Sequence, residues 1–206
     1  MRTLSLAALA ALVLPLAAPT AAPPGPITPD ERAMLVRDLT TAQQEFTAAT
    51  RGLTEAQWRF KPAPTRWSIA EVAEHIALVE QAIGGQVRGP LLATPETEPA
   101  ADAAAAEGRY RTLMADRSAK FNAPEGFVPS GTWATTDALV AAQLANHTTT
   151  LHYVHGTQDA LRWHRLPHPA LGPMDGVQWL VFMAAHTRRH VQQIEEVKQA
   201  EGYPAK

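Results

Sequence analysis

Two histidines near the C-terminal end of the chain have the spacing of a metal-binding pair on a helix. His186 and His190 are four residues apart, so their imidazoles lie on neighbouring turns of one helix face. At 100° per residue and with Met183 as the reference direction, His190 lies about 20° away and His186 about 60° away. Both rings therefore project from an apolar face that must be buried. The residues expected to point outward are Arg188, Arg189 and Gln192.

A pair of imidazoles does not complete a metal site, so a third ligand has to come from another helix. His75 is the leading candidate, because it lies beside the apolar stripe of Val72, Ile76 and Val79. Periodicity alone favours the other interpretation, in which His75 is exposed on a helix flank. It also allows His186 and His190 to be core histidines with ordinary hydrogen-bond partners.

The five other histidines are expected to be mostly structural or solvated. On helical spacing, His147, His152 and His155 do not point to one common place. One of these three could still serve as a fourth ligand or as a group behind a ligand. The remaining two, His164 and His168, fall in or beside a proline-rich segment.

The overall composition excludes several kinds of chemistry. The 206 residues contain no cysteine, which rules out disulfides, thiolate nucleophiles and thiolate zinc sites. Charged residues make up 18% and the formal net charge is -2, so there is no basic stripe to neutralise phosphates. We therefore expect a small-molecule substrate or ligand and no nucleic acid.

The N-terminus has the pattern of a secretory signal. Arg2 precedes an uncharged apolar run from Leu4 to Leu16, and small residues follow from Ala17 to Ala22. We expect cleavage near Ala22 and an exported, periplasmic or extracellular, protein. The alternative is an uncleaved membrane anchor, although the 13-residue run is shorter than the ~20 residues that a spanning helix needs.

Helical periodicity is strong in four segments and predicts an all-α domain over residues 29–203, after a signal peptide at 1–22 and a proline-rich linker at 23–28. The first, third and fourth predicted helices span 29–51, 136–163 and 176–201. The second starts at the capping box Ser68 to Glu71 and is ended or weakened by Gly84 and Gly85. A loop-rich insertion with a short helix near 105–120 separates the second from the third. The segment 166–176 is predicted to be a loop, and no strand pattern is evident. Four amphipathic helices favour an up-down four-helix bundle.

Three motifs, in matching order, resemble the DinB-like (DinB/YfiT-type) family. They are the segment WSIAEVAEH over Trp67–His75 with its upstream connector Leu53–Pro62, the loop HPALG over His168–Gly172, and HTRRHVQQI over His186–Ile194. The resemblance covers most of the chain after the export segment, except 86–134. It implies a four-helix bundle with a three-histidine metal site, which here is His75, His186 and His190. Members of the family include thiol-dependent transferases and candidate metal-dependent hydrolases.

Three imidazoles would hold a divalent ion, zinc or nickel for preference, and leave positions for water or substrate. A bound water could then act as a nucleophile at neutral pH. The candidates for proton transfer are Glu74 and Asp159, because Glu71 is committed to the capping box. A polar line on the third helix could form the wall of a substrate pocket or a solvated face: Asn146, Thr150 and Tyr153.

We consider an exported metal-dependent hydrolase first. The alternatives are a non-catalytic bundle that binds a metal or small ligand, a thiol-dependent S-transferase-like enzyme, and a plain structural bundle. Export disfavours the transferase, because the thiol-dependent relatives use cytosolic thiols. A homodimer is compatible with the sequence, and membrane contact is expected only through an uncleaved signal.

Overall fold

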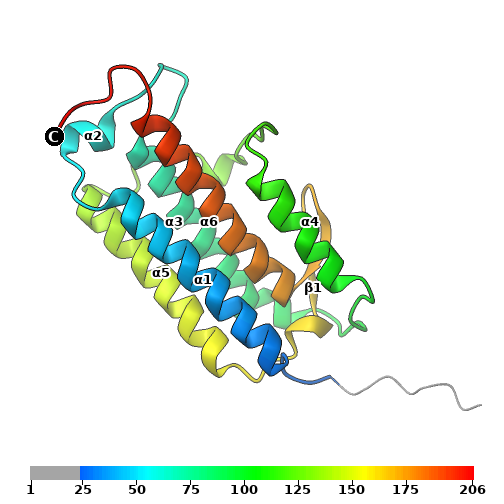
Figure 1. The fold of residues 1–206 in the computed structure, drawn as a ribbon. Coiled ribbons are helices and arrows are strands. Elements are labelled where there is room, and N and C mark those ends of the chain that lie inside the picture. The colour runs from blue at the N-terminus through cyan, green and yellow to red at the C-terminus, as the bar shows by residue number, and fades with distance from the viewer. Residues whose placement is uncertain (1–23) are drawn as a thin grey trace, which may run out of the picture.

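The computed structural model describes residues 24–206, and four of its helices form a bundle (Figure 1). They are α1 (Pro29–Thr50), α3 (Ile69–Arg88), α5 (Thr136–Gly156) and α6 (Gly176–Lys198). This confirms the predicted four-helix bundle. The predicted export segment, 1–22, lies outside the described residues. None of the helices within 24–206 combines the length and the apolar character needed to cross a bilayer.

The smaller elements connect the four helices. α2 (Glu55–Arg59) lies in the first connector, and α4 (Ala103–Ala115) packs against the outside of α6. The 3-10 turns are η1 (Pro90–Ala93), η2 (Glu125–Phe127) and η3 (Leu161–Trp163). The strands β1 (Arg165–His168) and β2 (Gly172–Asp175) form an antiparallel hairpin in which Pro167 pairs with Pro173.

Reciprocal capping boxes fix where three of the bundle helices begin. At α1, α3 and α6 the capping side chains are Thr28, Ser68 and Asp175, and each accepts from the amide three residues later. The side chain at that later position in turn accepts from the capping residue's own amide. Two otherwise unpaired donors are satisfied at each helix start, so these starts could be read from the sequence.

The four helices form two parallel pairs, because α4 returns the chain between α3 and α5 (Figure 1). Asn146 contacts Ala77 and Thr150 contacts Arg88, so α3 and α5 run in the same direction. α1 and α6 also run together, and each packs against one member of the other pair in the opposite direction. α1 therefore lies between α5 and α6, and so does α3.

A layer of polar side chains crosses the middle of the bundle and separates two apolar clusters. At its centre the carboxylate of Glu80, 1% exposed, accepts from Gln143 Nε2 at 2.9 Å and from the Thr187 hydroxyl at 2.7 Å. Gln143 also exchanges hydrogen bonds with Gln43 on α1. We call Gln43, Glu80, Gln143, His147 and Thr187 the polar layer.

The structure departs from the sequence predictions at several places. The third predicted helix, 136–163, ends earlier, at Gly156. The segment 166–176, predicted to be a loop, forms the β1–β2 hairpin, whose turn needs Gly172 at φ 77°. Four-residue strands that contain proline give too short a pattern to recognise. The helix α3 also continues through Gly84 and Gly85 to Arg88, although the two glycines were expected to end or weaken it.

Arg189 was predicted to face solvent, but it is buried at 5% exposure. Its guanidinium donates to the carbonyl oxygens of Met114 at 3.1 Å and Asp116 at 2.6 Å, and also to that of Ala119. Because α4 covers this side of α6, the arginine satisfies carbonyls at the end of α4 that would otherwise lack donors. The helical wheel could not reveal this covering.

The two neighbouring glycines of α3 provide a matched test of the packing. A Cβ at Gly84 would lie 2.6 Å from Thr150 Oγ1, whereas nothing lies within 4 Å of one at Gly85. We expect Gly84→Ala to lower the free energy of unfolding by about 1–3 kcal/mol through overpacking. Gly85→Ala should raise it by about 0.5–1 kcal/mol through helix propensity. Urea denaturation measures both, and equal effects would contradict the close approach of α3 to α5.

Candidate metal centre

Three histidines converge between α3 and α6. The Nε2 atom of His186 lies 3.2 Å from Nε2 of His75 and 3.1 Å from Nε2 of His190. One nitrogen from each of the three rings lies within 4.8 Å of the others. Two nitrogens that share a zinc ion at ~2.0–2.1 Å are separated by about 2.9–3.4 Å, depending on the coordination angle. The observed spacing therefore suits a common divalent ion.

The antiparallel packing of α3 against α6 produces this convergence. His186 and His190 lie one turn apart on the face of α6 that meets α3, and their ring centroids are 4.4 Å apart. The ring of His75 comes from α3 and lies 5.0 Å from the ring of His186 and 4.6 Å from that of His190. All three side chains are buried. The sequence predicted this set, and the structure brings it together.

Hydrogen bonds on the far side of two rings aim their lone pairs at the common point. His75 Nδ1 lies 2.8 Å from the carbonyl oxygen of Phe127, and His190 Nδ1 lies 2.9 Å from Gln193 Oε1. Both oxygens accept, so both Nδ1 atoms carry the proton and both Nε2 atoms carry a lone pair. This is the usual support for a metal-binding imidazole.

The nitrogens also fit a cation better than they fit one another. His186 Nε2 can donate a hydrogen bond to only one of its two neighbours, which leaves the other facing it with a lone pair. Three converging lone pairs in a buried space are satisfied together by a positive ion. The remaining ring nitrogen, His186 Nδ1, has no partner in the part of the chain that the structure describes.

Burial keeps the three rings neutral at pH 7. It lowers the pKa of His75, although the hydrogen bond to Phe127 partly opposes this. Burial, together with repulsion from His190 and His75, places the pKa of His186 well below its usual range. For His190, burial and the neighbouring His75 lower the pKa to about 3. Neutral imidazole is the form that binds metal, so protons compete weakly here.

Two aromatic residues flank the cluster. The ring of Trp67 lies 5.1 Å from that of His75, and the ring of Phe182 lies 5.7 Å from that of His186. Apolar neighbours lower the local dielectric and limit the entry of water. Trp67, which precedes the capping residue Ser68 in the WSIAEVAEH motif, therefore forms part of the surroundings of the three histidines.

Glu74, a predicted candidate for proton transfer, is engaged elsewhere. Its carboxylate accepts from the backbone amides of Ser130, Gly131 and Thr132 at 2.9–3.1 Å and from the Thr132 hydroxyl at 2.8 Å. Burial raises the pKa of Glu74, but these hydrogen bonds outweigh it and the net pKa is lowered. The residue thus anchors the loop that follows Phe127, whose carbonyl orients His75.

The other predicted site residues lie at α5, which packs on α3 and α1 and lies diagonally across the bundle from α6. Asn146 donates to the carbonyl of Ala77, and Thr150 accepts from Arg88. Asp159 accepts from the hydroxyls of Tyr153 at 2.6 Å and of Thr157 at 2.8 Å, beyond the C-terminal end of α5. The structure brings none of Asn146, Thr150, Tyr153 and Asp159 to the three histidines.

The remaining histidines also stand apart from the cluster. His147 is buried beside Glu80, and His164 lies 2.8 Å from the carbonyl of Thr94. The Nδ1 atom of His168 accepts from the amides of Ala170 and Leu171. The other two, His152 and His155, are exposed.

Sequence reasoning missed the two groups that orient the rings. Gln193 lies within the motif HTRRHVQQI, three residues after His190, and this spacing could have indicated its role. The carbonyl of Phe127 gives no such signal, because a backbone oxygen carries no residue-type signature. It comes from a segment that the family motifs did not cover.

A family model described as the DinB superfamily matches residues 38–194. The protein YuaE of Bacillus subtilis (strain 168), described as uncharacterized, is 24% identical over 155 residues, which cover 72% of this chain and 88% of YuaE.

Two solved structures share the fold. YfiT from Bacillus subtilis matches with a TM-score of 0.57 at 15% identity, over 86% of this chain and 91% of YfiT. It is described as "a probable metal-dependent hydrolase with an unusual four-helix bundle topology". TT2238, described as a four-helix bundle protein, matches with a TM-score of 0.52 at 18% identity, over 80% of this chain and 98% of TT2238.

The anchoring role of Glu74 predicts a stability effect. Glu74→Gln should lower the free energy of unfolding by about 1–3 kcal/mol at pH 7, because an amide accepts less strongly and brings a donor that faces amides. The lowered pKa means that this contribution is present above the usual carboxyl pKa and is lost as the pH falls through the folded-state value. Thr132→Val, which removes one of four donors, is the control. Urea denaturation that finds Glu74→Gln no more disruptive than Thr132→Val would exclude this role.

The lowered pKa of His190 predicts that the metal-free protein loses stability on acidification. The unfolded chain takes up a proton near pH 6.5, while folded His190 stays neutral to a pKa of about 3. Between pH 7 and pH 5, His190 alone should lower the free energy of unfolding by about 2 kcal/mol. His190→Leu should reduce that loss, whereas exposed His152→Leu should not. Denaturation in EDTA at both pH values measures it, and identical slopes for wild type and His190→Leu would refute it.

Proposed function

This chain belongs to the DinB superfamily, and on that premise we propose that it is an exported metal-dependent hydrolase of a small-molecule substrate. The observation that carries the proposal is the convergence of three neutral imidazole nitrogens on one point between α3 and α6. The description of the fold relative YfiT as "a probable metal-dependent hydrolase" supports the same class of reaction.

His75, His186 and His190 would hold the ion. Their all-nitrogen ligand set suits zinc, nickel, iron or copper, and of these we propose zinc or nickel. When bound, such an ion would act as a Lewis acid, lower the pKa of a coordinated water to ~7 and leave coordination positions open for substrate. Gln193 and the Phe127 carbonyl keep two of the rings in the tautomer that binds metal. Trp67 and Phe182 restrict bulk water around the rings.

A non-catalytic metal-binding bundle is the second candidate. Among the described residues, the cluster of possible metal ligands contains the three histidines and no carboxylate. Glu74, the acidic neighbour of His75 in the sequence, is occupied by the loop amides. This arrangement suits a reaction whose proton transfers involve water or substrate, and equally a protein that only binds.

Export is proposed on the pattern of the N-terminus. The charge at Arg2, the apolar run Leu4–Leu16 and the small residues that end at Ala22 support it. Export also separates this chain from cytosolic thiols, which favours hydrolysis over thiol transfer. Fractionation of cells that express the full chain tests this point, with a variant lacking residues 2–22 as the control.

Metal content tests the centre directly. We expect one equivalent of zinc or nickel per chain after metal loading, measured by elemental analysis of the purified protein. Removing a ligand leaves two imidazoles, so His190→Ala should weaken binding by at least about 100-fold. The control is His152→Ala, because His152 is exposed on α5. No stoichiometric metal in the wild type would exclude both the hydrolase and the metal-binding bundle.

Activity separates the two candidates. Metal-loaded protein should hydrolyse at least one member of a panel of p-nitrophenyl esters, p-nitroanilide amides and p-nitrophenyl phosphodiesters. His190→Ala should reduce that rate to background, while His152→Ala should not. Turnover that survives in metal-free His190→Ala would contradict the proposed mechanism. Full metal occupancy without turnover of any substrate in the panel would favour the binding bundle.

A further inference from the structure

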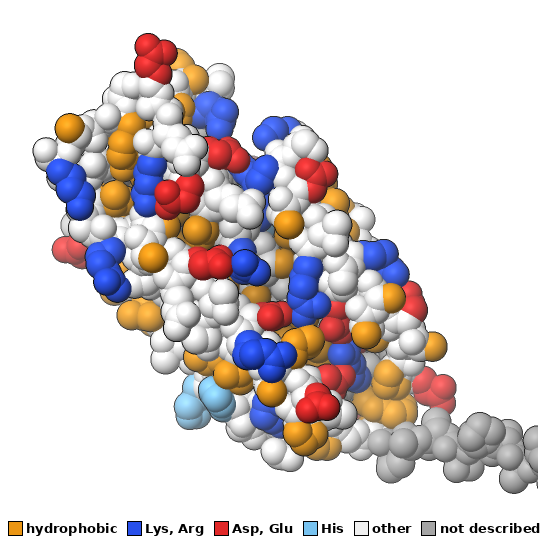
Figure 2. Space-filling view, viewed as in Figure 1, with side chains coloured by type: hydrophobic (Ala, Val, Ile, Leu, Met, Phe, Trp, Pro, Cys, Tyr) orange, Lys and Arg blue, Asp and Glu red, His pale blue; other side chains and the backbone are white. Residues whose placement is uncertain are grey.

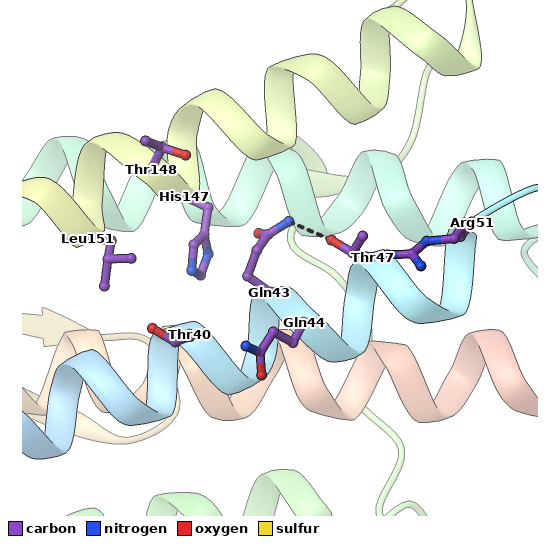
Figure 3. A pocket seen from close by; sticks show the side chains of 8 residues that line it. All are labelled: Thr40, Gln43, Gln44, Thr47, Arg51, His147, Thr148 and Leu151. Atoms are coloured by element: carbon purple, nitrogen blue, oxygen red, sulfur yellow. Dashed lines mark hydrogen bonds between the residues drawn. The ribbon is translucent and has the colours of Figure 1, made fainter.

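A second pocket lies between α1 and α5, away from the three histidines (Figure 3). Its volume is about 300 Å³. Seven of its eight lining residues have polar side chains, although most of the surface that they expose to the pocket is carbon. The residues that matter here are Thr40, Gln43, Thr47 and Arg51 on α1 and His147 and Thr148 on α5. A pocket of this volume is large enough for a small molecule.

A buried imidazole nitrogen without a partner faces this pocket. His147 is 2% exposed, and its ring points from α5 towards α1 into the pocket (Figure 3). Its Nδ1 lies 3.4 Å from Glu80 Oε1, while Nε2 has no hydrogen-bond partner among residues 24–206. Buried polar atoms of native proteins are rarely left unpaired, so this nitrogen points to a ligand or ordered water.

The partner of Nδ1 decides what Nε2 requires. The carboxylate of Glu80 already accepts from Gln143 and Thr187, and it can offer His147 only a further acceptor. When the ring is neutral, this contact favours the proton on Nδ1, which leaves Nε2 with a lone pair. A ligand that satisfies it must bring a donor such as a hydroxyl group.

Charge at the pocket favours an anionic ligand. No acidic residue lines the pocket, while the guanidinium of Arg51 does. None of the ion pairs found among the described residues involves Arg51, so its charge is available. Guanidinium groups pair well with carboxylates. Arg51 lies two turns along α1 from Gln43, about 12 Å at the helical rise, so an extended ligand fits better than a compact one.

We propose that the pocket between α1 and α5 binds a small, extended, hydroxylated organic acid. A hydroxyl of the ligand donates to Nε2 of His147, and its carboxylate pairs with Arg51. The hydroxyls of Thr40 and Thr148 and the amide of Gln44 can both donate and accept, so they suit the remaining hydroxyl groups, whereas Gln43 is already bonded to Thr47 and Gln143. This binding is independent of the proposed metal centre, which lies between α3 and α6.

Three molecules that share a six-carbon chain test the two recognition elements separately. D-Gluconate carries both hydroxyls and a carboxylate, hexanoate lacks the hydroxyls, and D-sorbitol lacks the carboxylate. Calorimetric titration of the purified protein should show saturable binding of gluconate. Hexanoate and sorbitol should each bind at least about tenfold more weakly, because each loses one strong hydrogen-bonding interaction. Absence of gluconate binding, or equal affinity for all three, would overturn the proposal and leave a water-filled pocket.

Neighbouring threonines of α1 supply a matched pair of variants that locate the binding. Thr40 lines the pocket and Thr41 is exposed outside it. Thr40→Trp should fill the pocket and abolish gluconate binding, while Thr41→Trp should leave it unchanged. Gluconate binding that survives Thr40→Trp would place the ligand elsewhere.

Two further variants assign the contacts. Arg51→Ala, at an exposed position, should remove the preference for gluconate over sorbitol. His147→Leu should remove the preference for gluconate over hexanoate. Because His147 is buried and could be required for folding, Arg51→Ala and Thr40→Trp decide the proposal even if His147→Leu does not fold. An unchanged preference in Arg51→Ala would refute the anionic part of the ligand.

Discussion

A single carboxylate, that of Glu80, is the group around which the bundle is arranged. It is almost completely buried, and a buried charge is tolerated only when hydrogen bonds replace the lost water. Gln143 from α5 and Thr187 from α6 supply those bonds, and Gln43 continues the network to α1. All four helices therefore contribute to one polar layer. Sliding any helix by one turn would leave buried polar groups unpaired, so the layer fixes the register of the bundle.

With the helices in this register, the polar layer contacts both the turn of α6 that carries the histidine pair and the ring of His147. Thr187 directly follows His186, so the bond to Glu80 positions the turn of α6 that carries the histidine pair. On the other side, the same carboxylate faces His147 and orients its ring towards the pocket between α1 and α5. Over the face seen in Figure 2, acidic and basic side chains are interspersed.

The extent to which sequence predicted the structure follows from the range of the interactions. Capping boxes act over three residues and apolar stripes repeat over a single helix, so the helix starts and the pairing of His186 with His190 could be read locally. His75 required the family resemblance, because periodicity left its ring between the core and solvent. The role of Glu74 depends on a loop more than 50 residues away. Arg189 looked exposed only because α4, which covers it, belongs to the least periodic part of the chain.

The polar residues on α5 also show that sequence periodicity cannot identify the neighbour of a helix face. Asn146 and Thr150 share a face, and the sequence allowed that face to be either a pocket wall or solvated. The structure packs it against α3, because the parallel arrangement of α3 and α5 follows from the return of the chain along α4. Gly84 permits that contact by omitting a Cβ where Thr150 lies. Residue types that are suited to substrate binding thus join two helices, while His147 and Thr148 are the polar residues of α5 that line the pocket shared with α1.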